Sequence, residues 1–181
     1  MSNIIPGHSA PTAGFEVPLE MLSACHHRIE RQCATLRRLV DHLATHGPDQ
    51  QARDAAAGVM RYFDTAGRDH HADEEEDLFP ALIESMAGSD PICLREITQG
   101  LATEHREIES HWLRVRAALE RIAAGESAQL GSADVEALAL AYERHIAREE
   151  SEVLPMAARL LSDEVLDEIG RAMRKRRGIE I

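Results

Sequence analysis

The sequence predicts an all-α protein, an up-down-up-down four-helix bundle that ends in a short fifth helix. Its apolar residues are mostly Ala, Leu, Ile and Val, and only 3% of residues are aromatic, a composition that favours helices. Apolar residues also recur at alternating steps of three and four along four long segments, as in bundle helices. With 181 residues, the chain is long enough for one domain with a sizeable core.

The expected elements follow from the loop signals in chain order. Residues 1–17 are rich in proline and glycine, so we expect a flexible lead-in followed by a single domain over 18–181. Pro18 suits a first helical turn. Clusters of loop-forming residues then divide the domain into helices over 19–46, 50–86, 91–124, 133–160 and 163–177. Short connections between long helices imply antiparallel neighbours.

Polar side chains interrupt the apolar stripe of every long helix. The inward positions fall on His26, His70, Glu74, His105, His145 and Glu149. At about 1.5 Å of rise per residue, His26 and His70 both lie roughly 30 Å from the loop that joins their helices, so they should meet. The neighbouring His27 and His71 lie about 100° further round their helices and are expected to face away from the core. Each long helix thus aims one histidine inward.

A repeat surrounds two of these histidines. Both His70 and His145 are followed four residues later by a glutamate, which places a nitrogen and a carboxylate on one helical face. The surrounding strings, HHADEEEDLFP and HIAREESEVLP, match each other, and we interpret the bundle as a duplicated pair of helices with a shared inward site. The acidic residues beside these pairs are expected to form a solvated rim: Glu75, Glu76, Asp77, Glu150 and Glu152.

Two carboxylates and four imidazoles in a bundle core require a compensating charge. Burial of each ionised group alone would cost several kcal/mol. Imidazole and carboxylate ligands suit iron, manganese or zinc, and two glutamates that can bridge favour two metal ions over one. We favour iron, with zinc or manganese as the alternative.

The four-part pattern H, HxxxE, H, HxxxE resembles the hemerythrin family, specifically the bacterial HHE cation-binding domains, over about residues 19–160. This resemblance implies a non-haem di-iron centre with two irons per chain and an oxo or hydroxo bridge. By the same resemblance, the six inward residues look like the metal ligands, with Glu74 and Glu149 as the bridging ones.

The sequence departs from the oxygen-carrying hemerythrins at two positions. Those proteins have a second histidine one turn after the third-helix ligand, where this chain has Glu109, and an aspartate five residues after the fourth-helix histidine, where this chain has Glu149 at four. Glu109 is therefore a further candidate metal ligand, with a hydrogen bond to an imidazole or a surface charge as alternatives. Fewer histidines leave more open or water-filled coordination positions, which favours sensing or consuming a ligand, or buffering iron, over reversible oxygen carriage.

The leading functional hypothesis is a cytoplasmic di-iron protein that binds, senses or scavenges a small ligand such as O2, NO or peroxide, or that buffers iron. A di-metal oxidase or peroxidase with ferroxidase-like or catalase-like turnover is the alternative, so enzymatic activity stays open. A third hypothesis, a metal-free helical interaction module, would require the inward histidines to be accidental.

Charge and hydropathy argue against other classes of partner. A net charge of -12 is unsuited to nucleic acid, and the basic run over 174–177 is interpreted as a complement to the helix dipole and the acidic body. No apolar run is long enough for a membrane helix and no signal peptide is apparent, so we expect a cytoplasmic protein without membrane contact. Neither a protein partner nor an oligomeric state is predicted.

Overall fold

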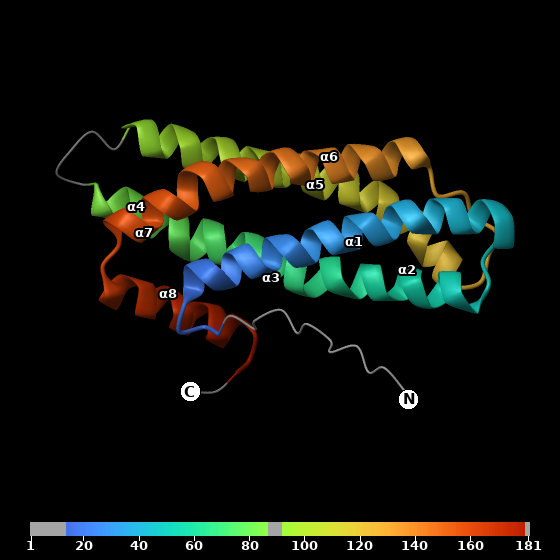
Figure 1. The fold of residues 1–181 in the computed structure, drawn as a ribbon, viewed down its shortest axis with the longest axis horizontal. Coiled ribbons are helices and arrows are strands. Elements are labelled where there is room, and N and C mark those ends of the chain that lie inside the picture. The colour runs from blue at the N-terminus through green and yellow to red at the C-terminus, as the bar shows by residue number, and fades with distance from the viewer. Residues whose placement is uncertain (1–13, 87–91, 180–181) are drawn as a thin grey trace, which may run out of the picture.

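Helices build the whole described architecture (Figure 1). The computed structural model describes residues 14–86 and 92–179, and every regular element in these ranges is helical. The α-helices are α1 (Pro18–His46), α2 (Gln50–Tyr62), α3 (Arg68–Ala72), α4 (Phe79–Ser85), α5 (Ile92–Ala123), α6 (Ser132–Arg148), α7 (Leu154–Leu160) and α8 (Asp163–Arg176). The same ranges contain the π-helical segments η1 (Phe63–Gly67), η2 (Asp73–Leu78) and η3 (Glu149–Val153). The prediction of an all-α bundle is confirmed.

Four long rods form the bundle: α1, the run from α2 to α4, α5, and α6 together with α7. Both α1 and α5 pack against α2 and α6, so each rod lies beside rods that run in the opposite direction (Figure 1). Helix α8 lies outside these rods and contacts α1 and η2. The helices expected over 50–86 and 133–160 exist as continuous rods, but their π segments were not anticipated.

Local signals set the helix boundaries. Pro18 occupies the first turn of α1, and the helix ends at Gly47, whose φ of 67° suits a residue without a Cβ atom. Asp49 caps α2 by accepting a hydrogen bond from the backbone N–H of Ala52 at 2.9 Å. Ser162 caps α8 in the same way. These caps coincide with the loop signals in the sequence.

Part of the expected lead-in can be placed. Residues 14–17 form a turn against the C-terminal end of α8, where the Phe15 ring lies 5.7 Å from the Arg174 guanidinium and 5.6 Å from that of Arg177. Residues 1–13, which make up the rest of the lead-in, and the loop expected over 88–91 lie outside the described residues.

The apolar core divides into two clusters along the bundle. One cluster holds residues such as Ile29, Leu36 and Leu138, and the other holds residues such as Leu22 and Leu82. The inward histidines and glutamates come between the two clusters in the first three rods. In the fourth rod Glu149 does so, and His145 lies at the edge of the first cluster beside Ile146. The candidate site is therefore a polar layer sealed by apolar packing on both sides.

A π segment also shifts the core register of the fourth rod. The alternation read from the sequence continues from Val153 by a step of three to Met156, but Ala157, four residues after Val153, is the fully buried residue and Met156 is half-buried. The hydrogen bonds of a π-helix span five residues instead of four, so η3 contains a wider turn and displaces the following face.

Within the described residues, no helix combines the length and the apolar character needed to cross a bilayer.

Candidate metal centre

The six inward side chains predicted from the stripes are all buried in one layer. The structure leaves at most 1% of each exposed: His26, His70, Glu74, His105, His145 and Glu149. One histidine comes from each rod, and the two glutamates come from the second and fourth rods. The structure thus brings together every inward residue that the sequence singled out.

Both glutamates lie in π segments, Glu74 in η2 and Glu149 in η3. Each π segment is followed by a proline at the second position of the next α-helix, Pro80 in α4 and Pro155 in α7. Proline has no N–H, and in a regular α-helix its ring clashes with the carbonyl four residues earlier, so these prolines favour a wider turn. The repeated strings DLFP and EVLP, which end in these prolines, were a sequence signal for the π segments. Such segments occur often at functional sites.

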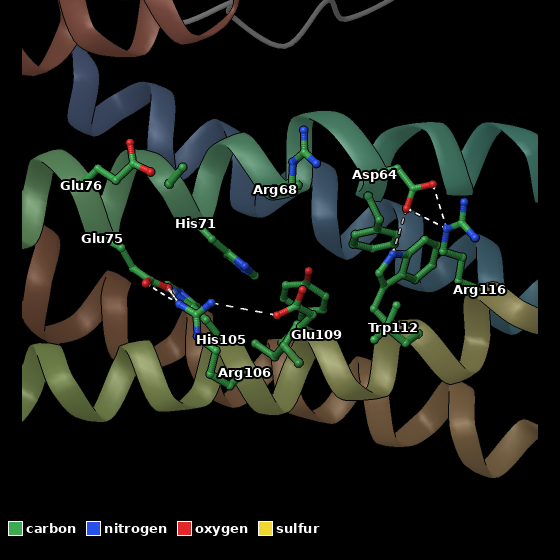
Figure 2. Close-up of a pocket in the computed structure, with 16 residues that line it drawn as sticks. Asp64, Arg68, His71, Glu75, Glu76, His105, Arg106, Glu109, Trp112 and Arg116 are labelled. Carbon is green, nitrogen blue, oxygen red and sulfur yellow. Dashed lines mark hydrogen bonds and ion pairs between the residues drawn. The ribbon is translucent and has the colours of Figure 1, made fainter.

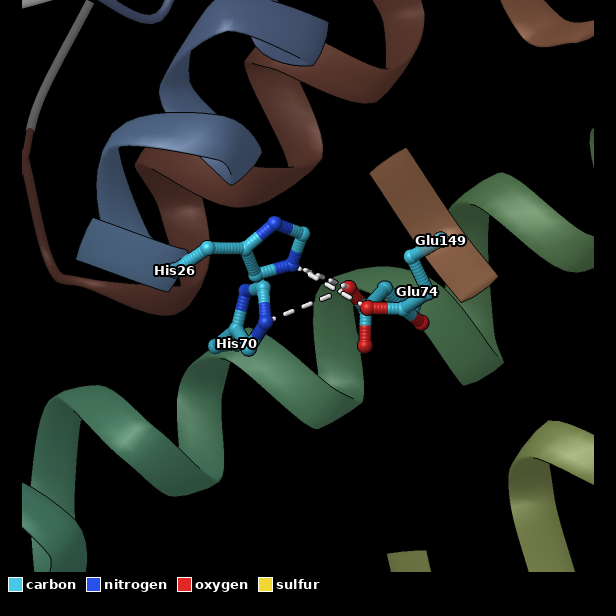
Figure 3. Close-up of side chains that lie close together, drawn as sticks. All are labelled: His26, His70, Glu74 and Glu149. Atoms are coloured by element: carbon cyan, nitrogen blue, oxygen red, sulfur yellow. Dashed lines mark ion pairs between the residues drawn. The ribbon is translucent and has the colours of Figure 1, made fainter. Parts of the chain in front are cut away.

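One half of the layer joins His26 and His70 to the two glutamates (Figure 3). The Nε2 atom of His26 lies 3.1 Å from Glu149 Oε2 and 3.8 Å from Glu74 Oε1. The Nε2 atom of His70 lies 3.2 Å from the same Glu74 Oε1. Oxygen and nitrogen donors bound at about 2.0–2.2 Å from a metal ion would stand roughly 3 Å apart, which matches these separations.

The other half joins His105 and His145 to the same glutamates. His105 Nε2 lies 3.3 Å from Glu74 Oε2, and His145 Nε2 lies 3.2 Å from Glu149 Oε1. Each glutamate therefore turns one oxygen toward each pair of histidines. This is the arrangement in which a carboxylate can bridge two cations.

Carboxylates outside the layer orient three of the histidines through their other ring nitrogen. The Nδ1 atoms of His26, His105 and His145 donate to Glu150 at 2.6 Å, Glu75 at 2.7 Å and Glu104 at 2.9 Å, respectively. Because an ionised carboxylate only accepts, these contacts leave each Nε2 lone pair available toward the centre. Such partners also raise the basicity of a histidine ligand.

Sequence reasoning missed these three carboxylates. Glu75 and Glu150 were expected in the solvated rim, but each contacts a buried imidazole. Their signal was positional, since each directly follows an inward glutamate of the repeat. Glu104 precedes His105 and reaches across to His145 on the neighbouring rod, a contact that spacing along one helix does not reveal.

The centre of the layer is dominated by hydrogen-bond acceptors. The four oxygens of Glu74 and Glu149 have no hydrogen-bond partner among the described residues, and neither does His26 Nε2 or either ring nitrogen of His70. Unpaired acceptors at this depth are costly unless protons or metal ions lie between them.

Without a cation, protons are held by the same groups. Burial is the largest single effect on His26 and lowers its pKa, but contacts with Glu149 and Glu74 together outweigh burial and raise the pKa to about 11. Burial also lowers the pKa of His145, but contacts with the nearby glutamates outweigh burial and raise this pKa to about 9. Burial prevails at His70 and lowers its pKa to about 4. Protons and metal ions would thus compete for this layer.

Glu109 is not brought into either group. Its side chain is 61% exposed, and it pairs with Arg106 on the surface of α5 at 4.0 Å. It follows His105 by one helical turn, but its exposed side chain is directed toward Arg106 instead of the layer. Of the alternatives left open for Glu109, the structure therefore matches a surface charge.

The expectation that His71 faces away from the core is wrong. Its ring stacks on that of His105, with centroids 3.9 Å apart and planes 12° apart, and its Nε2 atom is buried. His71 lies one residue round the helix from His70, on the flank of the second rod that faces α5, and from there its side chain reaches the ring of His105. His27 does face outward, with 73% of its side chain exposed.

The acidic run of η2 is tied to the C-terminal end of α8. Arg177 Nη2 lies 2.6 Å from an oxygen of the fully buried Asp73, and Arg176 pairs with Asp73, Glu76 and Asp77. The expected solvated rim is thus partly neutralised by arginines. Their charges complement the acidic body, as interpreted from the basic run.

A family model describing the hemerythrin HHE cation-binding domain matches residues 17–157. This chain belongs to the hemerythrin HHE family. The matched range contains all six residues of the buried layer, and an HHE domain indicates a metal-binding protein, typically one that binds iron. The HHE chain is also 31% identical over 168 residues to an uncharacterized protein of Haemophilus influenzae (strain ATCC 51907 / DSM 11121 / KW20 / Rd), a match covering 93% of this chain and 94% of that protein.

Proposed function

We propose that this HHE protein holds two iron ions and that six side chains bind them: His26, His70, Glu74, His105, His145 and Glu149. The observation that carries the proposal is the pairing of two four-residue groups that share both glutamates. Within each group the donor atoms lie within 4.8 Å of one another. Two histidine nitrogens and two carboxylate oxygens suit iron, with manganese or zinc as competing ions.

The charges of the surrounding residues support two cations. Glu74 and Glu149 contribute two negative charges inside the layer. Three further carboxylates lie against the imidazole Nδ1 atoms: Glu150, which adds a third negative charge, and Glu75 and Glu104, which are also paired with Arg106 and Arg148. These outer carboxylates keep the histidines oriented and make them stronger donors. The positive charge of two metal ions would thus be offset over a short distance.

The donor count supports binding of a small ligand. Each group offers four protein donors, fewer than the six positions of an octahedral ion, so positions remain for an exogenous molecule. Because the layer is almost fully shielded from solvent, the fitting molecules are O2, NO and peroxide. Bound iron would supply redox chemistry and the open coordination positions, while the protein excludes larger substrates.

The test is metal loading of variants that remove one half of the layer. The wild type, loaded with ferrous iron under anaerobic conditions, should hold about two irons per chain. Two double variants each remove the histidines of one half: His26→Ala/His70→Ala and His105→Ala/His145→Ala. Each should bind fewer than two irons per chain. The two variants should lose different ions, which spectroscopy of protein loaded with both iron and zinc can distinguish.

His27→Ala is the matched control, because His27 is the exposed neighbour of His26. It should retain both irons and respond to NO or peroxide as the wild type does. Less than one tightly held metal ion in carefully loaded wild type, or equal loss of metal in His27→Ala and His26→Ala, would contradict the proposal.

A further inference from the structure

A pocket of about 570 Å³ opens on the side of the bundle, between the α3–η2 run and α5 (Figure 2). Its volume lies within the range of small-molecule sites in proteins. Glu109 and Arg106 lie at its edge, whereas His71 and His105 line it more deeply. The pocket is separate from the buried layer, yet it shares the His105 ring with that layer.

A buried polar atom of a residue that lines this pocket lacks a partner. His71 Nε2 is shielded from solvent and has no hydrogen-bond partner among the described residues. The ring is held flat against His105 and points into the space between the two rods (Figure 2). A buried polar atom without a partner costs about 1–3 kcal/mol, so a molecule that supplies a hydrogen bond at this point is favoured.

Aromatic rings form the neighbouring wall. The centroid of the Phe63 ring lies 4.7 Å from that of Trp112 and 5.5 Å from that of Tyr142, and the Tyr142 ring lies 6.1 Å from His71. The Trp112 N–H already donates to Asp64 at 3.1 Å, so the indole offers the pocket its apolar surface. Flat apolar walls of this kind fit a planar aromatic molecule.

The charged side chains that line the pocket are paired, with the exception of Arg68, which has no ion-pair partner among the described residues. Arg116 binds Asp64 at 2.9 Å, and Arg106 binds Glu75. This pairing favours an uncharged ligand over an organic ion. A hydroxyl group is the fitting polar element, because it both donates and accepts and therefore satisfies either tautomer of His71.

We propose that this pocket binds a small uncharged phenol, with its ring against Phe63 and Trp112 and its hydroxyl hydrogen-bonded to His71 Nε2. The site goes beyond the proposed iron function and does not depend on it. Its position places the ligand one stacked ring away from the metal layer, so an organic molecule can occupy the protein together with a small ligand in the layer.

Trp112 is the one tryptophan of the chain and reports directly on this pocket. We would titrate zinc-loaded and metal-free protein with 4-methylphenol, and with toluene as the analogue without a hydroxyl, while following indole fluorescence at wavelengths where phenols do not absorb. In the wild type, 4-methylphenol should give a saturable change in both forms. No saturable change up to the solubility limit would overturn the proposal and leave the iron proposal untouched.

Variants at His71 test the hydrogen bond. His71→Phe keeps a ring to stack on His105 but removes the nitrogen, so 4-methylphenol should bind about tenfold more weakly while toluene binding changes by less than about twofold. His71→Gln should restore most of the affinity, and the matched control His27→Phe should leave it unchanged. Equal weakening of both ligands in His71→Phe would overturn the assigned contact.

The position of the ligand can also be tested in the wild-type protein, without any variant. An intermolecular nuclear Overhauser effect between the 4-methylphenol methyl group and the Trp112 indole should be present at saturation. Its absence would overturn the placement of the ligand in this pocket.

Discussion

The Nε2 atoms of His105 and His145 face each other at 2.9 Å, although the two residues come from different rods. Their Nδ1 atoms are engaged elsewhere, with Glu75 and Glu104. Two nitrogen lone pairs repel at this distance unless a proton or a metal ion lies near both. Protons and metal ions should therefore replace each other between these rings.

Metal binding should release protons. The pKa values of about 11 for His26 and about 9 for His145 mean that both imidazoles are protonated at pH 7 when no metal is bound. Metal ions bind the neutral ring, so loading at pH 7 should release about two protons per chain. Calorimetric titration in buffers of different ionisation enthalpy measures this number. Release of no protons would contradict the predicted competition.

The stability gained from metal should increase with pH. A raised histidine pKa stabilises the metal-free fold fully below the unfolded value of about 6.5, and this contribution is lost as pH rises through about 9 for His145 and about 11 for His26. Over the same range, deprotonation favours metal binding. The difference in melting temperature between loaded and metal-free protein should therefore grow from pH 6.5 to 9 and shrink toward pH 5. A constant difference would contradict the assignment.

Replacing both inward glutamates should separate metal binding from folding. Glu74→Gln/Glu149→Gln removes the bridging charges, so metal should no longer raise the melting temperature. The metal-free double variant should still fold, because without the carboxylates His26 and His145 can lose their protons and leave no unpaired charge in the layer. Calorimetry with and without metal measures both effects. A large loss of stability in the metal-free variant would show that the glutamates are needed for folding itself.

The outer carboxylates should tune metal affinity without forming the site. Glu75→Gln and Glu104→Gln weaken the contacts to the Nδ1 atoms of His105 and His145, and each should lower metal affinity by about tenfold to a hundredfold. Glu152→Gln is the matched control, because Glu152 is an exposed acid of η3. Competition with a chelator gives the affinities. Equal affinities in all three variants would remove the role assigned to Glu75 and Glu104.

The link between α8 and η2 should contribute to stability. Asp73 is fully buried and adjoins Glu74, so Arg177→Leu leaves a buried carboxylate with less compensation. We expect a loss of about 1–3 kcal/mol in the free energy of unfolding, less than for a fully broken buried ion pair, because Arg176 still contacts Asp73. Lys175→Leu, at an exposed position of the same turn, should change it by less than about 0.5 kcal/mol. Similar losses in both variants, measured by denaturant unfolding, would argue against the link.

The sequence was sufficient for the residues that obey helical periodicity. His26, His70, His105 and His145 interrupt regular apolar stripes, so stepping along each helix was enough to aim them at one layer. The repeat of a histidine followed four residues later by a glutamate then identified the other two residues of the layer, Glu74 and Glu149.

The misplaced residues have two physical causes. One cause is the π segment η3, whose wider turn precedes the position where Ala157, instead of Met156, fills the core. The other is reach between rods, which lets His71 contact the ring of His105 from a position beside the apolar stripe. Contacts between rods depend on side-chain reach, which periodicity does not encode. For that reason the sequence did not indicate that Glu104 contacts His145. It also left open whether Glu109 is a metal ligand, a hydrogen-bond partner of an imidazole or a surface charge, and the 61% exposure of the side chain favours the surface charge.

Anomalous X-ray diffraction at the iron edge, from crystals of iron-loaded protein, would locate the two proposed ions directly. Two peaks should appear in the buried layer about 3.5–4 Å apart, as in other two-metal sites. One should lie beside His26 and His70, the other beside His105 and His145, with Glu74 and Glu149 reaching both. A single peak in the layer, or peaks only at surface acids such as Glu109, would contradict the account.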